Sequence, residues 1–256
     1  IRRAGGSADS DVDAMNLFDG GTFLTQNQSL SSGVGTFSNS SGLFTVPAGG
    51  EKVITMKIDI DNNTTSGKTL GWTLAAADIT SDASSVSGSA NGNLFTVANV
   101  TDIGYMEVAN VTPGAATTVD PQDNYELWRF KLDSNDQNML LKSLTLTNVG
   151  STATSDLQNM KLMDGATQLG ATVSQASNSK VSFDLSGMTD GGLKMLSGTT
   201  KQLSLRGDIK AGTNRTYRWS LQNTYEAVVM DLNYNVEVTV SGDGAAPDVH
   251  VGQAEG

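Results

Sequence analysis

An internal repeat with a period of about 147 residues constrains the fold of this chain more than any other feature. Three blocks recur in the same order: DVDAMNLFDGGT at 11–22 matches DLQNMKLMDGAT at 156–167, EKVITMKIDI at 51–60 matches TKQLSLRGDI at 200–209, and KTLGWTLAA at 68–76 matches RTYRWSLQN at 215–223. The offset between matching residues changes only from 145 to 149. We therefore expect two copies of one fold in series, with loops of slightly different length.

The recurrent blocks alternate apolar and polar residues in the manner of β-strands. In KVITMKIDI, for example, Ile54, Met56 and Ile58 fall on one face. Asp-Gly pairs at 19–20 and 164–165 favour hairpin turns, because both residue types tolerate the positive φ of tight turns. No segment shows a sustained helical period. The sequence predicts an all-β fold of two tandem immunoglobulin-like β-sandwich repeats.

The expected domains are residues 1–120 and 121–256, the second with a C-terminal tail. The boundary is placed in the linker-like stretch GAATTVDPQDN, which is rich in Gly, Pro and Asp. Trp72 and Trp219 occupy matching repeat positions inside strands, so both are expected in the cores, and Trp128 is expected to be buried as well.

The first copy is expected to lack its opening strands. The second copy contains the strands ELWRFKL and LKSLTL before the residue that matches Ile1, which is Leu146. The loss leaves an open apolar groove at Ile1 and Ala4, with a deficit of roughly 6 to 15 kcal/mol. An upstream extension of the polypeptide or a strand from a neighbouring molecule is expected to fill this groove. The C-terminal segment PDVHVGQAEG, with Val249 and Val251 on one face, is a candidate donor strand.

Composition disfavours several function classes. The formal net charge is −11, which opposes binding to nucleic acid and to anionic lipid. No apolar run approaches the roughly 20 residues that span a bilayer, so membrane insertion is not expected. Cysteine is absent and His250 is the only histidine, which excludes disulfides, thiolate metal sites and zinc sites with several histidines. We expect no catalytic residues and no enzyme activity.

Closely spaced acidic residues raise the question of a structural calcium ion. Asp9, Asp11 and Asp13 stand at alternate positions, and Asp59 and Asp61 form a second pair. Calcium prefers six to eight hard oxygen ligands of this kind. The alternative interpretation is that these residues are solvated acids at strand ends. No other cofactor is expected.

Seven asparagines lie in Asn-x-Ser/Thr sequences and are candidate glycosylation sites. They are Asn27, Asn39, Asn62, Asn63, Asn99, Asn110 and Asn214. A chain rich in Asn, Ser and Thr also produces such sequences by chance.

The order of blocks ELWRFKL, LKSLTLTNVG, SDLQNMKLMDGATQLG, SKVSFDL, TTKQLSLRGDI and RTYRWSL resembles the immunoglobulin-like repeats of long bacterial surface proteins. The resemblance covers nearly all of the second copy and residues 1–76 of the first, whereas residues 77–119 depart from it. It implies an extracellular or cell-surface protein of the S-layer, stalk, adhesin or filament type.

The expected function is therefore that of a structural subunit. It would assemble into a homopolymeric filament, sheath or surface layer by strand addition between subunits. The alternative is a monomeric adhesin stalk or a carbohydrate-binding accessory module, which exposed aromatic residues within 77–119 would favour.

Overall fold

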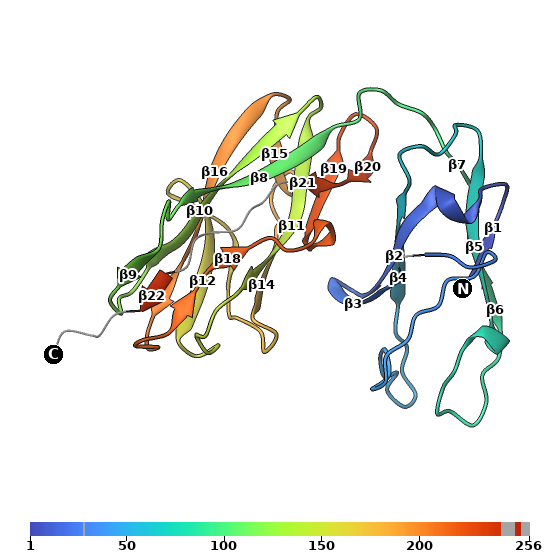
Figure 1. The fold of residues 1–256 in the computed structure, drawn as a ribbon, viewed down its shortest axis with the longest axis horizontal. Helices are drawn as coiled ribbons and strands as arrows, with labels where there is room; N and C mark the ends of the chain where they lie inside the picture. The colour runs from blue at the N-terminus through green and yellow to red at the C-terminus, as the bar shows by residue number, and fades with distance from the viewer. Residues whose placement is uncertain (28, 242–248, 252–256) are drawn as a thin grey trace. The chain divides into compact units, whose positions relative to one another are not determined.

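The computed structural model describes residues 1–27, 29–241 and 249–251, and it divides the chain into the compact units Ile1–Val100 and Thr101–Gly256. The regular structure in these ranges is β-strand apart from three single-turn 3₁₀ helices, which confirms the expected all-β fold (Figure 1). None of the described helices is long and apolar enough to cross a membrane. The division falls before the linker expected near residue 120, because β8 pairs with β10 inside the second unit.

The second unit is built from strands that form two main sheets. They are β8 (Tyr105–Thr112), β9 (Thr117–Val119), β10 (Tyr125–Asn135), β11 (Met139–Asn148), β12 (Leu157–Asp164), β13 (Thr167–Val173), β14 (Lys180–Asp184), β15 (Leu193–Met195), β16 (Thr199–Ile209), β17 (Thr216–Tyr217), β18 (Trp219–Ser220), β19 (Ala227–Asp231), β20 (Val236–Val238), β21 (Val240–Ser241) and β22 (Val249–Val251), with the 3₁₀ helix η3 (Thr224–Glu226).

One main sheet of this unit has the order β13-β12-β16-β10-β8-β21, and the other has the order β14-β11-β19-β20. Side chains from both sheets meet in one core, which includes Phe130 and Leu205 from the first sheet and Leu144 from the second. Trp128 and Trp219 are fully buried in this core, as predicted. The second unit is thus a β-sandwich whose two sheets share a continuous apolar interior.

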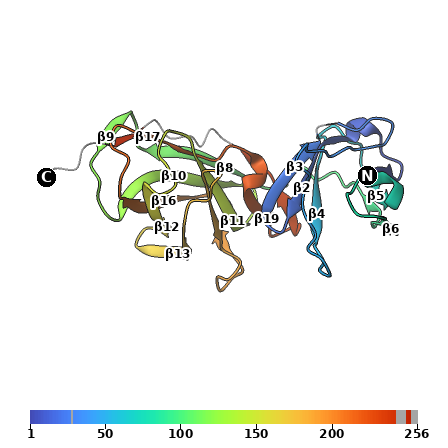
Figure 2. The same cartoon turned by 90° about the horizontal axis from the view of Figure 1, so that it is seen from below.

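The first unit is built from fewer strands, which also form two sheets. They are β1 (Arg2–Ala4), β2 (Val12–Asp19), β3 (Thr22–Asn27), β4 (Ile54–Ile60), β5 (Thr69–Ala75), β6 (Ser89–Asn91) and β7 (Phe95–Thr96), with the 3₁₀ helices η1 (Asp9–Asp11) and η2 (Ala76–Asp78). One sheet has the order β3-β2-β4 and the other the order β1-β5-β6, with β7 also paired to β5. Figure 2 shows β2–β4 and β5–β6 as separate layers of this unit.

Strands that the repeat aligns pair in matching registers in the two units. In the first unit Leu17 faces Met56 across β2 and β4, and in the second Leu162 faces Leu205 across β12 and β16. Likewise Arg3 faces Trp72 in the β1–β5 pair, as Asn148 faces Trp219 in the β11–β18 pair.

The predicted Asp-Gly turns are present in both units. Gly20 and Gly165 connect β2 to β3 and β12 to β13, with φ of 58° and 59° respectively. A glycine suits these positions because other residues rarely adopt positive φ.

The first unit has a much smaller core than the second. Among the described residues, its buried cluster consists of Val12, Met15 and Leu70, with Trp72 only half-buried. Its apolar positions on β4 are half-buried or exposed, whereas Leu203, Leu205 and Ile209 at matching positions on β16 are at most 1% exposed. The same alternating pattern therefore produces a closed core in one unit and an open one in the other.

A matched pair of substitutions tests this difference. Ile60 is 42% exposed and its counterpart Ile209 is 1% exposed. We expect Ile209→Ala to lower the free energy of unfolding of the second unit by about 2 to 5 kcal/mol. Ile60→Ala should cost the dispersed first unit less than about 1 kcal/mol. Hydrogen exchange in increasing urea, followed separately for each unit, measures both free-energy changes. Equal losses of stability in the two units would contradict the open core of the first unit.

Candidate functional site: open strand edges in the first unit

The outer edge of β4 is the most distinctive feature of the first unit. In the described part of the chain β4 pairs only with β2, whereas its counterpart β16 lies between β12 and β10. Val53, just before β4, is 75% exposed, and Ile54 and Met56 are half-buried. An edge with free backbone groups and apolar side chains is a template for another strand.

A second open edge belongs to β7. β7 pairs with β5 through Leu70 and Phe95, as β22 pairs with β17 in the second unit through Tyr217 and Val249. β22 also pairs in parallel with β9 on its other side, and β7 has no such partner among the described residues. Phe95 is consequently 67% exposed and the neighbouring Leu94 is 59% exposed.

A third exposed position follows η2. The matching helix η3 leads directly into β19, whose Ala227 faces Leu144 of β11. Ile79, the residue that matches Ala227, has no such strand beside it among the described residues, and it is 44% exposed and outside any strand. All three openings therefore correspond to contacts that residues 117–144 supply in the second unit.

Ile1 and Ala4, the residues predicted to line an open groove, have backbone partners within the first unit. Ala4 pairs with Gly71 in the β1–β5 ladder, and the carbonyl of Ile1 accepts the Gly35 N–H at 2.9 Å. These two residues are held within the unit because β5 and the loop near Gly35 lie beside β1. Within the described residues β4 and β7 are each paired on one side, whereas their counterparts β16 and β22 are paired on both.

The candidate donor strand is already paired in this structure. The backbone of β22, which contains Val249 and Val251, pairs with β9 and with β17 of its own unit. The rest of the segment PDVHVGQAEG lies outside the described residues. Its use as a donor would require β22 to leave that sheet.

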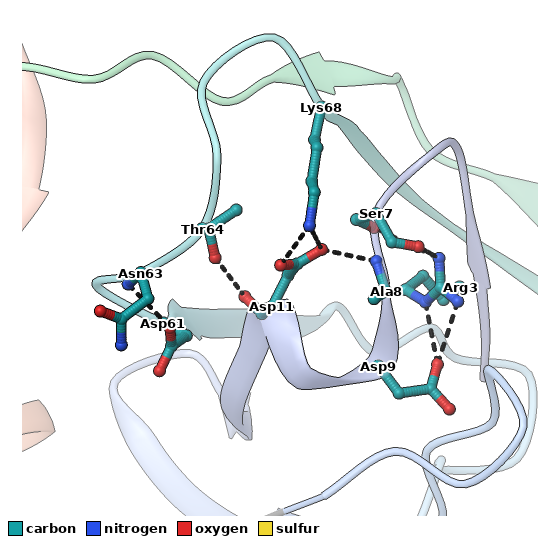
Figure 3. A network of polar contacts seen from close by, with 9 residues as sticks. All are labelled: Arg3, Ser7, Ala8, Asp9, Asp11, Asp61, Asn63, Thr64 and Lys68. Carbon is teal, nitrogen blue, oxygen red and sulfur yellow. Dashed lines mark hydrogen bonds and ion pairs between the residues drawn. The ribbon is translucent and has the colours of Figure 1, made fainter.

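Three of the acidic residues considered for calcium, Asp9, Asp11 and Asp61, are bound to cationic or N–H groups of the first unit (Figure 3). Asp11 accepts hydrogen bonds from Lys68 Nζ at 2.7 and 2.8 Å and from the Ala8 N–H at 2.5 Å. Asp9 accepts from Arg3 Nε and Nη2 at 3.1 and 3.0 Å. The Lys68 ammonium lowers the pKa of Asp11, since a nearby cation favours the charged carboxylate.

The same ion pair recurs in the second unit. Asp156 accepts from Arg215 Nη1 at 2.8 Å and from the Ala153 N–H at 2.7 Å. These are the positions that match Asp11, Lys68 and Ala8. The repetition indicates that this acid closes the turn before β2 and β12 and joins it to the strand that begins near Lys68 or Arg215.

The remaining acids do not gather around one point. Asp13 is exposed, and Asp61 accepts the Asn63 N–H at 2.7 Å. No group of three or more Asp, Glu or His side chains in the described ranges is arranged to hold a metal ion. A calcium ion at these residues stays a proposal, and it would have to displace Lys68 and Arg3.

Asp59 differs from its counterpart in a way that points to the β4 edge. Asp208, the matching residue, accepts the backbone N–H of Asn124 at 2.9 Å and Asn159 Nδ2 at 2.7 Å, and these bonds lower its pKa. Asp59 is half-buried, and within the described residues its carboxylate accepts a long hydrogen bond of 3.4 Å from Asn16 Nδ2. Burial raises the pKa of Asp59, helped by the nearby Asp13 charge.

The glycosylation candidates fall into two groups. Asn110 accepts a bond from Trp128 Nε1 and donates to the Pro113 carbonyl, both at 2.9 Å, and Asn27 donates to the Thr36 carbonyl at 2.7 Å. A glycan on Asn110 would attach at Nδ2, the atom that donates to the Pro113 carbonyl. The other five candidates are exposed, and modification there stays a prediction: Asn39, Asn62, Asn63, Asn99 and Asn214.

The second unit contains a cavity of about 320 Å³ beside the start of β10. Tyr125, Leu127 and Arg129 line it together with Tyr217. Arg129 Nη2 donates to Glu126 Oε2 at 2.7 Å. This pocket has aromatic, cationic and anionic side chains close together.

No protein-family model matches the chain, and no curated protein matches it. Among solved structures, the chain is similar to the seventh ScaB type I cohesin from Pseudobacteroides cellulosolvens, with 10% identity and a TM-score of 0.29 over 59% of this chain and 96% of that chain.

It is also similar to a chain of the Coh-OlpA–Doc918 type I cohesin–dockerin complex from Clostridium thermocellum, with 9% identity and a TM-score of 0.32 over 57% of this chain and 99% of that chain. A third is CaCohA2 from Clostridium acetobutylicum, with 8% identity and a TM-score of 0.32 over 59% of this chain and 92% of that chain. Similarity at this level supports no statement on function.

Replacing Asp59 and Asp208 by asparagine tests the difference between the two acids. Asp208→Asn should lower the free energy of unfolding of the second unit at neutral pH, because its carboxylate accepts two hydrogen bonds. Asp59→Asn should leave the dispersed first unit unchanged or more stable, because burial disfavours the charge that it removes.

The pH dependence of the two acids should have opposite sign. The pKa of Asp208 is lowered, so its contribution is present above about pH 4 and is lost as pH falls through the folded pKa. The pKa of Asp59 is raised, so the first unit gains stability as pH falls through that raised value. Urea unfolding of wild type and of both variants at a series of pH values measures the free energy of unfolding of each unit. If both variants lost stability with the same pH dependence, the proposed difference between Asp59 and Asp208 would be refuted.

Chelation tests the calcium proposal. If calcium joins the Asp9–Asp13 and Asp59–Asp61 stretches, then removing it with a chelator should lower the melting temperature of the first unit and leave the second unit unchanged. An unchanged melting temperature for both units would remove the proposal.

Proposed function

We propose that this chain is a structural subunit of an extracellular filament, sheath or surface layer, and that its first unit is completed by strand addition from a neighbouring subunit. The observation behind the proposal is the edge of β4, which is unpaired in the described residues although its counterpart β16 is paired on both sides. Strand addition supplies main-chain hydrogen bonds along such an edge, and the added side chains fix its register.

The energetic argument compares equivalent side chains. Leu203, Leu205 and Ile209 are fully buried because β10 and the second sheet cover them. Complete burial of one aliphatic side chain contributes about 1.5 to 3 kcal/mol. The matching β4 residues are already partly buried, so completing their burial would add part of this amount for each residue to the stability of the joint between subunits. This gain favours slow dissociation.

The extracellular location is supported by the resemblance of the repeat blocks to bacterial surface proteins. The net charge of −11 gives such a subunit a surface that repels nucleic acid and anionic lipid. No catalytic role is proposed. The chain would act by self-assembly into a homopolymer.

A second candidate function is supported by the cavity beside β10. Tyr125 and Arg129 could hold a sugar or another small polar ligand in a monomeric stalk or accessory module. Phe95 and Tyr105, at 67% and 40% exposure, are exposed aromatic residues within 77–119. They lie in different units, so each would act separately. A monomeric elution profile together with polysaccharide binding would favour this function.

A charge placed on the open edge tests the assembly function. Ile60→Lys should fold like wild type, because this side chain is 42% exposed, but it should reduce assembly because strand addition would bury the new charge. Val46→Lys is the matched control, since Val46 is 49% exposed in the same unit and lies outside β4. Light scattering and sedimentation over a concentration series measure assembly. Equal assembly of Ile60→Lys and wild type would refute the role of this edge.

A further inference from the structure

We infer that the partner of the first unit is one continuous segment of a neighbouring subunit that runs parallel beside β7 and then antiparallel beside β4. This inference rests on the proposed assembly function and specifies the chemistry and path of the strand that carries it. Its basis is the way in which one segment of the second unit, residues 117–135, fills the two equivalent edges there.

The path in the second unit is direct. β9 pairs in parallel with β22, from Thr117 opposite Val249 to Val119 opposite Val251. The chain then crosses through residues 120–124 and enters β10, which pairs antiparallel with β16. β22 and β16 match β7 and β4. A segment with the same path would therefore reach both open edges of the first unit in one pass.

The register of β10 sets the side chains that the partner segment needs. Trp128 faces Leu205 and Phe130 faces Leu203 across the β10–β16 ladder. These leucines match Met56 and Ile54 of β4. The inferred segment thus presents large apolar side chains at alternate positions opposite Met56 and Ile54, with polar residues between them.

The crossing between the two strands has its own attachment point. In the second unit Asp208 accepts the Asn124 N–H at 2.9 Å, and Arg206 Nη2 donates to the Asn124 carbonyl at 2.9 Å. The residues that match Asp208 and Arg206 are Asp59 and Lys57, again an acid and a cation on one strand. The backbone of the partner segment is placed to bond these two side chains where it passes from β7 to β4.

Two separate edges of the first unit agree with this path. One is the edge of β4, which carries the half-buried Asp59, and the other is the edge of β7, where Phe95 and the preceding Leu94 are exposed. Each corresponds to contacts that residues 117–135 make in the second unit. A single segment accounts for both edges, whereas a strand beside β4 alone would leave β7 open.

Two peptides from the second unit serve as probes. The long peptide, Ala115–Asn135, contains the counterparts of both strands, and the short peptide, Asn124–Asn135, contains only the β10 part. Both should bind the dispersed full chain. The long peptide should bind about 100-fold more tightly, because its two strands are joined by a short connection. Hydrogen exchange should show protection at residues 54–60 with both peptides and at residues 95–96 only with the long one.

Matched controls test the side-chain and backbone contacts separately. A long peptide with Trp128, Phe130 and Leu132 replaced by serine should lose binding, because its apolar anchors are gone. The chain variant Asp59→Asn should bind the long peptide more weakly, and Asp13→Asn should bind it as wild type does.

The outcomes separate this inference from the proposed function. If both peptides protect only residues 54–60 with equal affinity, the single path is wrong and strand addition at β4 stands. If neither peptide binds and wild type does not assemble, the proposed function fails as well.

The source of the segment is tested in the assembled protein. Two batches of the chain, each labelled with a different nitrogen isotope, are mixed and assembled, and the assembly is then cross-linked through Lys57. Cross-links between differently labelled chains support a neighbouring subunit. Cross-links found only within one chain would overturn that source and show that the segment belongs to the same polypeptide.

Discussion

The unpaired outer edge of β4 is the constraint on which the rest of the first unit depends. Backbone N–H and C=O groups at a strand edge need partners, and the apolar side chains beside them need cover. In the second unit β10 supplies both to β16. In the first unit the described residues supply neither, so Ile54 and Met56 remain half-buried and the core shrinks to a few residues around Met15. Assembly by strand addition is the physical consequence that we draw from this edge.

The two units separate what local sequence determines from what a neighbouring strand determines. Registers, Asp-Gly turns and the Asp11–Lys68 ion pair recur in both units, because each depends on residues that both copies contain. Burial does not recur. Trp219 is fully buried and Trp72 is half-buried, although their cross-strand positions match. Asp208 accepts a backbone N–H from Asn124, in the segment that precedes β10. Among the described residues Asp59 accepts no matching backbone N–H, because no strand lies on the outer side of β4.

Much of this fold could be predicted from the repeated blocks, because alternation over seven or more residues fixes a strand and its inner face. The strands β2 to β5 and their pairing partners followed from that pattern. Which strands stay unpaired on one side did not follow from it. Ile1 and Ala4 are predicted at a groove, and in the structure Ala4 lies on β1, which pairs with β5 at one end of its sheet. The β7 edge could not be predicted, because the matching segments LFTV at 94–97 and DVHV at 248–251 have too few residues in common to be recognised as a repeat. Cationic partners such as Lys68, 57 residues from Asp11, likewise have no local signal.

Amide hydrogen exchange along β4 tests the central claim most directly, with β16 of the same molecule as the internal reference. In the dispersed chain, residues 54–60 should exchange faster than residues 203–209, because only one side of β4 is paired. On assembly their protection should rise toward that of β16, while the protection of β16 stays constant. Equal protection of the two strands in the dispersed chain, or no change at β4 on assembly, would contradict the account.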